Sequence, residues 1–380
     1  MKLLFLILGF FLPNTFSKKN YVIQEFTLNT NSTISTVVKP GIDSLDIKIG
    51  QMIIFGFYGT KINKSDPVYV AVKEGKVGSI LIYSRNISSS KTSDALKSLI
   101  NGFQDAATIP LFISIDQEGG LVNRLPQTLG FPSMPSALYL GNKNNPDITK
   151  YYSDNIAYTL SRLGINLNYA PVVDLHNPQC PVLGARERCF SSSPAKVAKQ
   201  ATEVIKSHNY FKVHTVLKHF PGHGSSTTDS HFGIADVTNT WKWEEITPYR
   251  ELIENNIADA IMTAHIVNGK LDKSKLPATL SRPVITSLLR DSLGFKGVIF
   301  SDDMQMQAIS NNFGLKESIQ KAITAGVDVL MFSNNIPGVK DYSPSNIHKI
   351  IKELVINGKI APERIEESFN RIMEMKKKWL

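Results

Sequence analysis

The chain has 380 residues, of which 42% are hydrophobic and 20% are charged, a balance typical of globular proteins with a large apolar core. This length suits two average domains or one large α/β barrel. The formal net charge is +9, but the lysines are scattered and form no basic stripe with interleaved aromatic residues, which argues against nucleic acid as a partner. An anionic polymer or surface is compatible with this charge.

Residues 1–17 have the features of an export signal. Lys2 supplies the positive start, and the apolar run Leu3–Leu12 is too short to cross a bilayer. Thr15 and Ser17 place small residues where a signal peptidase cuts, and the absence of Cys in this stretch excludes a lipid-modified N-terminus. We therefore expect export to the periplasm or the extracellular space, with an uncleaved anchor as the alternative.

Residues 18–44 are rich in Thr, Ser and Asn and show no sustained helical period, so we predict a linker or a poorly ordered arm. From residue 45 to the end of the chain, short apolar runs alternate with amphipathic stretches. This alternation is typical of βαβ units and a parallel sheet. No segment after the export signal is long and apolar enough to cross a membrane.

Eight apolar runs are the candidate strands. They are 52–57, 79–83, 111–115, 165–173, 215–217, 260–263, 298–300 and 327–332. Helical periodicity marks the stretches 92–104, 148–163, 195–208, 281–293, 345–355 and 362–378. Eight strand–helix units predict a single-domain (β/α)₈ barrel of the TIM type over residues 45–380. A doubly wound open sheet is the alternative, weakened by the lack of Gly-x-Gly-x-x-Gly after the first run.

Polar side chains follow the apolar runs directly, where barrel enzymes hold their catalytic groups. The stretches concerned are Asp116-Gln117-Glu118-Gly119-Gly120 with Arg124, Asp174-Leu175-His176, Lys218–His231, His265, Ser301-Asp302-Asp303 and Ser333-Asn334-Asn335. The densest of them is K-H-F-P-G-H-G-S-S-T-T-D-S-H, with one Lys, three His and one Asp in fourteen residues. An acidic, basic and hydroxyl-rich ring with few aromatic residues suits a small polyhydroxylated ligand.

Two cysteines, Cys180 and Cys189, lie nine positions apart in a loop-like segment. In an exported protein the default expectation for such a pair is a disulfide. It would close a small loop and hold Arg186 and Arg188 in place. Two free thiols are the alternative.

Several of these motifs resemble those of glycoside hydrolase family 3, specifically its single-barrel β-N-acetylglucosaminidases (β-N-acetylhexosaminidases) of the NagZ type. The motifs are K-I-G-Q-M at 48–52, D-Q-E-G-G with Arg124, K-H-F-P-G-H-G with D-S-H, M-T-A-H at 262–265 and G-F-K-G-V-I-F-S-D-D-M. The similarity runs from about Leu45 to the C-terminus. It implies a monomeric, retaining exo-enzyme without metal or cofactor that acts on peptidoglycan fragments or chitin-like amino-sugar glycosides.

The resemblance assigns the chemistry to three residues. Asp302 is similar to the nucleophile that forms a covalent glycosyl intermediate, and Asp303 is expected to be structural because side chains of an extended segment alternate. His231 resembles the acid/base, with Asp229 as its partner. An imidazole titrates near neutral pH, so it can protonate the leaving oxygen and later accept a proton from water, while Asp229 orients the ring.

The resemblance also implies which side chains hold the non-reducing N-acetylglucosamine. They are Asp116, Arg124, Arg186, Lys218 and His219. One departure concerns the short Gly-x-Arg-x-Phe pattern of the family, which here reads G-A-R-E-R-C-F at 184–190. Either Arg186 or Arg188 could fill the ligand role, and the spacing from Gly184 favours Arg186.

Three other readings stay open. A metal-dependent hydrolase would draw ligands from His219, His223, Asp229, His231 and His265, although Lys218 adjoins the cluster and a Pro-Gly turn interrupts it. A hexosaminidase could instead use the substrate's own acetamido group, with Asp302 and Asp303 as the carboxylate pair. A non-catalytic wall-binding protein is the third reading. Within the enzyme reading, phosphorolysis is conceivable because a His repels phosphate less than a carboxylate does, but we expect hydrolysis.

Overall fold

The computed structural model describes residues 22–27, 33–38, 44–229, 233–336 and 341–378. The chain divides into two compact units, residues 1–42 and 43–380, and each is considered separately. The expected export signal at 1–17 lies outside the described residues. No helix in the described part is long and apolar enough to cross a membrane.

The first unit contains a pair of antiparallel strands, β1 (Val22–Thr27) and β2 (Thr33–Val38). Their register runs from Val22 opposite Val38 to Thr27 opposite Thr33. Both strands are rich in Val, Ile and Thr, which favour extended backbone. The prediction of a linker for residues 18–44 did not anticipate these strands, because their alternation is broken by polar residues and is too short to be distinctive.

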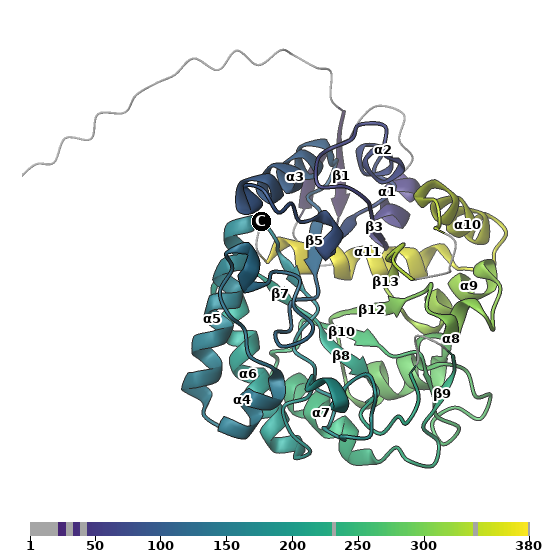
Figure 1. The fold of residues 1–380 in the computed structure, drawn as a ribbon. Helices are drawn as coiled ribbons and strands as arrows, with labels where there is room; N and C mark the ends of the chain where they lie inside the picture. The colour runs from purple at the N-terminus through teal and green to yellow at the C-terminus, as the bar shows by residue number, and fades with distance from the viewer. Residues whose placement is uncertain (1–21, 28–32, 39–43, 230–232, 337–340, 379–380) are drawn as a thin grey trace, which may run out of the picture. The chain divides into compact units, whose positions relative to one another are not determined.

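The second unit is a parallel barrel. Its strands are β3 (Ile53–Gly56), β4 (Ser79–Ile82), β5 (Phe112–Ile115), β6 (Leu167–Asn168), β7 (His214–Thr215), β8 (Leu217–Phe220), β10 (Ala260–Thr263), β12 (Val298–Asp303) and β13 (Val329–Phe332). Neighbours follow the order β7-β6-β5-β4-β3-β13-β12-β10-β8. Since only Val216 separates β7 from β8, the two ends of this order belong to one stretch of chain and the sheet closes on itself (Figure 1).

Each of the eight predicted runs overlaps a strand of this barrel, with β7 and β8 together in the fifth position, so the (β/α)₈ prediction is confirmed. Two further short strands, β9 (Ala235–Asp236) and β11 (Ile266–Val267), pair in parallel outside it. Aromatic rings fill the barrel interior. Phe300 lies 6.5 Å from Phe112 and 6.2 Å from Tyr169, centroid to centroid, and all three are buried. The interior is therefore a packed core rather than a pore.

Helices surround the strands (Figure 1). They are α1 (Ser44–Gln51), α2 (Pro67–Lys73), α3 (Thr92–Ala106), α4 (Ala137–Lys143), α5 (Pro146–Leu163), α6 (Pro194–Tyr210), α7 (Thr247–Glu254), α8 (Gln307–Ser310), α9 (Leu315–Ala325), α10 (Pro344–Ile356) and α11 (Pro362–Lys377). A π-helix spans Pro283–Ser292. The six predicted helical stretches are confirmed with small shifts at their ends. Pro at the first turn, for example after the Asn145 cap of α5, sets several of these starts.

The C-terminal helix α11 closes the barrel at the end where the strands begin. The buried Lys376 ammonium donates to the Gln51 side chain (2.7 Å) and to the carbonyls of Gly78 (2.9 Å) and Pro110 (2.7 Å). Those three residues precede β3, β4 and β5, so α11 ties the beginnings of three strands together. The opposite end, where the strands finish, is left for the site.

Candidate active site

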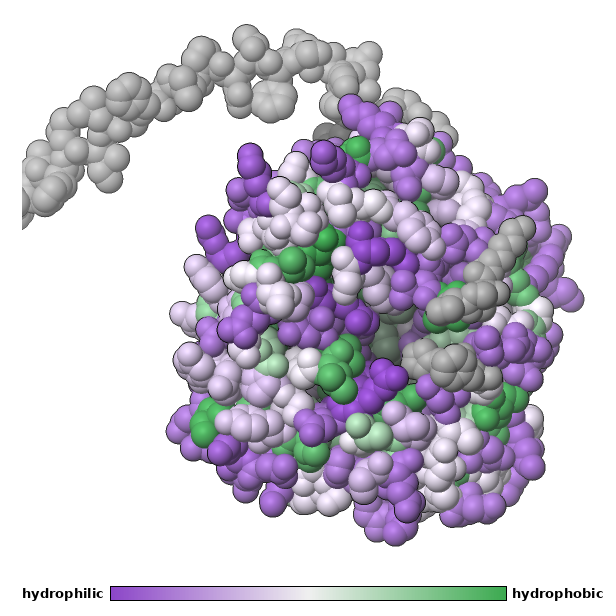
Figure 2. All heavy atoms as spheres, viewed as in Figure 1, coloured by the Kyte–Doolittle hydropathy of each residue, from purple (hydrophilic) through white to green (hydrophobic). Residues whose placement is uncertain are grey.

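Hydrophilic side chains surround a hollow near the centre of the face in Figure 2. Charged residues also lie at the ends of the strands. Asp116 follows β5, Lys218 and His219 lie within β8, and Asp302 and Asp303 end β12. Because all strands of a parallel barrel finish at the same rim, residues far apart in sequence converge here.

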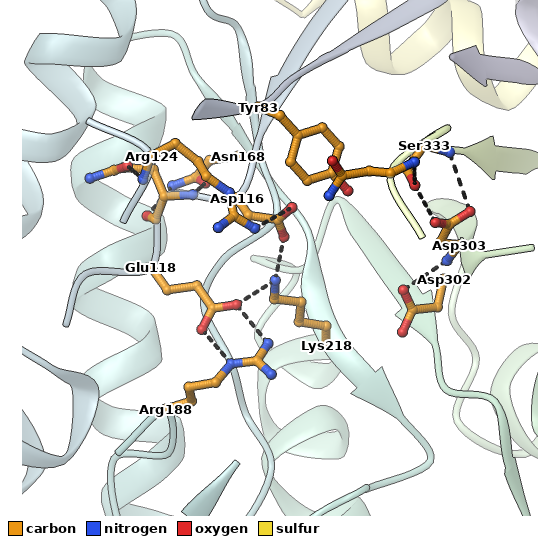
Figure 3. Close-up of polar contacts among 12 residues, drawn as sticks. Tyr83, Asp116, Glu118, Arg124, Asn168, Arg188, Lys218, Asp302, Asp303 and Ser333 are labelled. Atoms are coloured by element: carbon orange, nitrogen blue, oxygen red, sulfur yellow. Dashed lines mark hydrogen bonds and ion pairs between the residues drawn. The ribbon is translucent and has the colours of Figure 1, made fainter. Parts of the chain in front are cut away.

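Lys218 is the centre of the acidic side of the site. Its ammonium lies 2.8 Å from Asp116 Oδ1 and 2.6 Å from Glu118 Oε1, and its side chain is only 2% exposed (Figure 3). Arg124 approaches Asp116 from the other side, with Nη2 3.9 Å from Oδ2. Two carboxylates therefore share the buried ammonium, and the contact with Lys218 holds Asp116 in a fixed position at the rim.

Glu118 also binds Arg188 in a bidentate pair. Arg188 Nε lies 2.8 Å from Oε2, and Nη2 lies 2.8 Å from Oε1. Burial alone raises the pKa of Glu118, but the charges and hydrogen bonds of Arg188 and Lys218 outweigh it and hold that pKa well below its usual range. Glu118 was not predicted as a site residue. The available signal was its place in D-Q-E-G-G, two positions from Asp116 and so on the same side of extended chain.

The structure places the two candidate arginines differently. Arg186 ends a 3₁₀ turn, Gly184–Arg186, and is exposed, whereas Arg188 reaches the site and is 12% exposed. Glu187 between them has φ 55°, so the chain reverses direction at this point. Arg188 rather than Arg186 therefore joins the network of Glu118 and His219, because the extra residues form a turn rather than extended chain.

Asp174 organises the basic side of the site and was not assigned a role from the sequence. Its Oδ2 lies 2.7 Å from His219 Nδ1 and accepts from the His219 amide, and its Oδ1 accepts from the His223 amide at 2.7 Å. Burial raises the pKa of Asp174, but its contacts with His219 and His223 bring that pKa below the usual value. Arg188 Nη2 faces His219 Nε2 at 3.4 Å, so His219 is fixed between an acid and a cation.

The two aspartates at the end of β12 differ in their surroundings. Asp302 is half-buried, and its Oδ1 accepts from the Asp303 amide at 2.8 Å. Asp303 is buried and accepts from the hydroxyl and amide of Ser333 and from the Gln305 amide, and burial raises its pKa to about 6. Figure 3 shows Asp302 across the site from Lys218. Asp303 thus holds the loop after β13, in agreement with its expected structural role.

The predicted acid/base pair is only partly described. Asp229 is half-buried, while His231 lies outside the described residues. His265, a candidate ligand in the metal reading, is buried, with Nδ1 2.8 Å from Thr279 Oγ1 and Nε2 2.9 Å from the Asp303 carbonyl. Across residues 44–229, 233–336 and 341–378, no three His, Cys, Asp or Glu side chains are grouped to hold a metal ion.

The expected disulfide is not formed. Cys180 and Cys189 are both free and buried, in a small apolar cluster with Val172, Val182 and Leu183. Cys180 Sγ donates to the His223 carbonyl at 3.6 Å. Burial raises the pKa of both thiols, that of Cys189 well above its usual value. The two thiols therefore contribute to apolar packing in this cluster and form no covalent cross-link.

Comparison with known proteins identifies the class. Residues 44–375 match the family model for the glycosyl hydrolase family 3 N-terminal domain. The chain therefore belongs to glycoside hydrolase family 3.

Two relatives illustrate the similarity in sequence. The chain is 35% identical over 267 residues to the beta-hexosaminidase of Tolumonas auensis, which covers 69% of this chain and 77% of that protein. It is 32% identical over 324 residues to beta-hexosaminidase A of Pseudoalteromonas piscicida, covering 80% of this chain and 53% of that protein. The chain thus spans about half the length of this second relative.

Solved structures give the same picture. The family 3 beta-N-acetylglucosaminidase of Paenibacillus sp. str. FPU-7 superposes with a TM-score of 0.81 at 33% identity, covering 88% of this chain and 62% of that chain. The beta-N-acetylhexosaminidase of Beutenbergia cavernae superposes with a TM-score of 0.76 at 26% identity, covering 89% of this chain and 100% of that chain.

Proposed function

We propose that the chain is a retaining exo-β-N-acetylglucosaminidase that hydrolyses terminal, non-reducing N-acetylglucosamine from peptidoglycan fragments or related amino-sugar glycosides. The observation that carries this proposal is the half-buried Asp302 carboxylate at the end of β12, across the site from the paired charges of Asp116 and Lys218. The relatives support it, since they are named beta-hexosaminidases and beta-N-acetylglucosaminidases.

In this proposal the charged network binds the sugar hydroxyls. The Asp116 carboxylate, 18% exposed, accepts a hydrogen bond from a sugar hydroxyl, and the neighbouring cations donate to hydroxyl oxygens or the acetamido oxygen. Arg188 takes the place that the sequence gave to Arg186, because it joins Glu118 and His219 in the network. Since these donors and acceptors are already paired and oriented, the sugar binds without a large cost for ordering them.

Asp302 then attacks the anomeric carbon while the bond to the leaving oxygen breaks. His231, oriented by Asp229, gives its proton to that oxygen and later takes one from the incoming water. Attack by this water breaks the bond to Asp302 and completes two inversions, which give net retention. An ionised carboxylate suits this position because the transition state carries positive charge on the sugar ring.

Turnover of a chromogenic β-N-acetylglucosaminide, with the matching β-glucoside as control, tests the proposal. The wild type should cleave the acetamido sugar, Asp302→Ala should be inactive, and His231→Ala should lose less with a good leaving group because it needs less protonation. Failure of the wild type to cleave the acetamido sugar, together with binding of wall fragments, would replace this proposal by the binding-protein reading. Diversion of most product to a sugar 1-phosphate on adding phosphate would replace hydrolysis by phosphorolysis.

We also propose that residues 1–17 direct export, since their positive start, short apolar run and small residues fit a signal peptide. Full-length chain expressed in its host should be recovered outside the cytoplasm and should begin near Lys18. Recovery of the intact chain in the cytoplasm would contradict this proposal.

A further inference from the structure

Aromatic rings and guanidinium groups alternate along one side of the site. Arg85 Cζ lies 4.3 Å from the Tyr58 ring centroid and 5.2 Å from that of Tyr83, and Arg124 Cζ lies 5.3 Å from the Tyr83 ring. These residues follow β3, β4 and β5, three neighbouring strands of the barrel. We call Tyr58, Arg85, Tyr83 and Arg124 the rim stack.

The inner end of the rim stack belongs to the sugar-binding network. Arg124 Nη2 lies 3.9 Å from Asp116 Oδ2, and Figure 3 shows the Tyr83 ring between Asp116 on one side and Ser333 on the other. The rim stack therefore begins beside the residues proposed to bind the non-reducing sugar.

The outer end of the rim stack is Tyr58, whose side chain is exposed, with 56% of its surface accessible. Its hydroxyl donates to the Asn334 carbonyl at 2.9 Å and lies 3.4 Å from Asp341 Oδ1. Asn334 follows Ser333, which binds Asp303 beside the proposed nucleophile. Tyr58 is thus an exposed ring attached to the same loop that supports the reacting end of the site.

Arg85 fixes this ring rather than offering a charge to solvent. Its Nε and Nη2 donate to the carbonyls of Phe57 and Ser333, each at 2.9 Å, and its Nη1 donates to the Asn335 side chain. Each of the three guanidinium nitrogens of Arg85 thus donates to a protein oxygen. This arrangement makes the guanidinium poorly suited to bind an anion. The guanidinium also lies over the Tyr58 ring, nearer to it than to the Tyr83 ring, and this stacked cation holds Tyr58 in place.

We propose that Tyr58 is a platform for the leaving group, on which the uncharged pyranose ring of the amino sugar on the reducing side of the scissile bond stacks. An exposed aromatic ring held by a hydrogen bond and a cation loses little conformational freedom when a ligand covers it. Sugar rings present apolar C–H faces that pack on such a surface, and the Tyr hydroxyl is already engaged elsewhere. This inference rests on the proposed function.

Two substrates that differ only in the leaving group test the proposal. N,N′-diacetylchitobiose carries a second sugar that reaches Tyr58, whereas N-acetyl-β-glucosaminyl fluoride carries a leaving group too small to do so. Tyr58→Ala should lower kcat/KM for the disaccharide about tenfold and leave that for the fluoride within about twofold of wild type. Tyr58→Phe, which keeps the ring, should retain most of the activity on both.

Tyr151→Ala provides the matched control, because Tyr151 is a similarly exposed tyrosine on α5, on the outer layer of helices. This variant should change kcat/KM for neither substrate. Equal loss on both substrates in Tyr58→Ala would make Tyr58 a structural residue and overturn the platform. Unchanged turnover of both would overturn it as well. If the wild type cleaved neither substrate, the proposed function itself would fail, and the platform with it, a result distinct from the first two.

Discussion

Each end of the barrel holds a cluster of charged residues around a carboxylate. The two carboxylates differ in how fully protein groups surround them. At the closed end, Asp328 is fully buried and accepts from Arg290 (2.6 Å), Arg364 (3.0 Å), Arg371 (3.2 Å), Ser368 and the Ile299 amide. At the open end, Asp116 accepts from Lys218 yet keeps 18% of its side-chain surface exposed. The same kinds of residue thus serve two purposes.

The two clusters differ in how much of the hydrogen-bonding capacity of the carboxylate is taken up by donors of the protein itself. Burial raises the pKa of Asp328, but its three arginines outweigh that and lower it, so the carboxylate stays charged inside the protein. Such a group has no surface left for a ligand and acts on stability alone. At the open end, Asp116, Arg124 and Asp302 remain partly exposed. These side chains therefore keep hydrogen-bonding capacity for a ligand in the site.

The largest effect should come from Asp302. Replacing it as Asp302→Asn removes the attacking oxygen charge with little change in shape, so kcat should fall on the order of 10⁴-fold or more. Steady-state turnover measures this, and circular dichroism should match the wild type. If Asp302→Asn retained a tenth of the wild-type activity, Asp302 would not be the nucleophile. The contrast between a catalytic end and a stabilising end of the barrel would then fail.

The next effect concerns Glu118. Glu118→Gln leaves Lys218 and Arg188 as neighbouring cations around a neutral amide, so we expect kcat/KM to fall roughly 100-fold and the free energy of unfolding to fall by about 3 kcal/mol. Kinetics and denaturant unfolding measure the two quantities. The control is Glu74→Gln, an exposed partner of Lys76, which should cost under about 0.5 kcal/mol. A variant as stable and active as wild type would mean that Glu118 does not position the cations.

The closed end provides the matching test. Asp328→Asn leaves three arginines without their anion, so the free energy of unfolding should fall by about 3 kcal/mol. Below its lowered melting temperature, the folded variant should keep the wild-type kcat/KM, because Asp328 lies at the opposite end of β13 from the site. A change in kcat/KM without unfolding would contradict the separation of the two ends.

The smallest effect is a pH dependence at Lys376. Burial lowers the pKa of Lys376 to about 7, from an ordinary value of 10.5. Between these values the unfolded chain binds more protons than the folded one, so wild-type stability should gain a contribution that rises with pH above about 7 and is constant below it. Lys376→Met should lack this slope. Unfolding curves at pH 6 to 9 compare the two proteins, and parallel pH profiles would contradict the lowered pKa.

Much of the fold could be predicted from the sequence because buried parallel strands leave continuous apolar runs. The fifth strand was found from only three residues, Thr215–Leu217, because the charges of Lys218 and His219 follow it directly. The same rule placed Asp116 and Asp302 at one rim. These predictions depend on local pattern and on the topology of the barrel, both of which the sequence carries.

The rest depends on contacts between distant segments. Glu118 and Arg188 are 70 positions apart, and the choice of Arg188 over Arg186 depends on a turn at Glu187. Asp174 supports His219 from the segment that follows β6, 45 positions away. Likewise, Cys180 and Cys189 are near in sequence, but the apolar cluster that surrounds them decides that they stay free. No spacing rule reports such packing.

The most direct test of the account is to identify the atom that attacks the sugar. Wild type treated with a 5-fluoro N-acetylglucosaminyl fluoride, which slows release of the intermediate, should carry one sugar on the peptide that contains Asp302, as measured by mass spectrometry after proteolysis. The account predicts this adduct on Asp302 and its loss in Asp302→Asn. An adduct on Asp303, or release of an oxazoline from the substrate's acetamido group without any adduct, would contradict it.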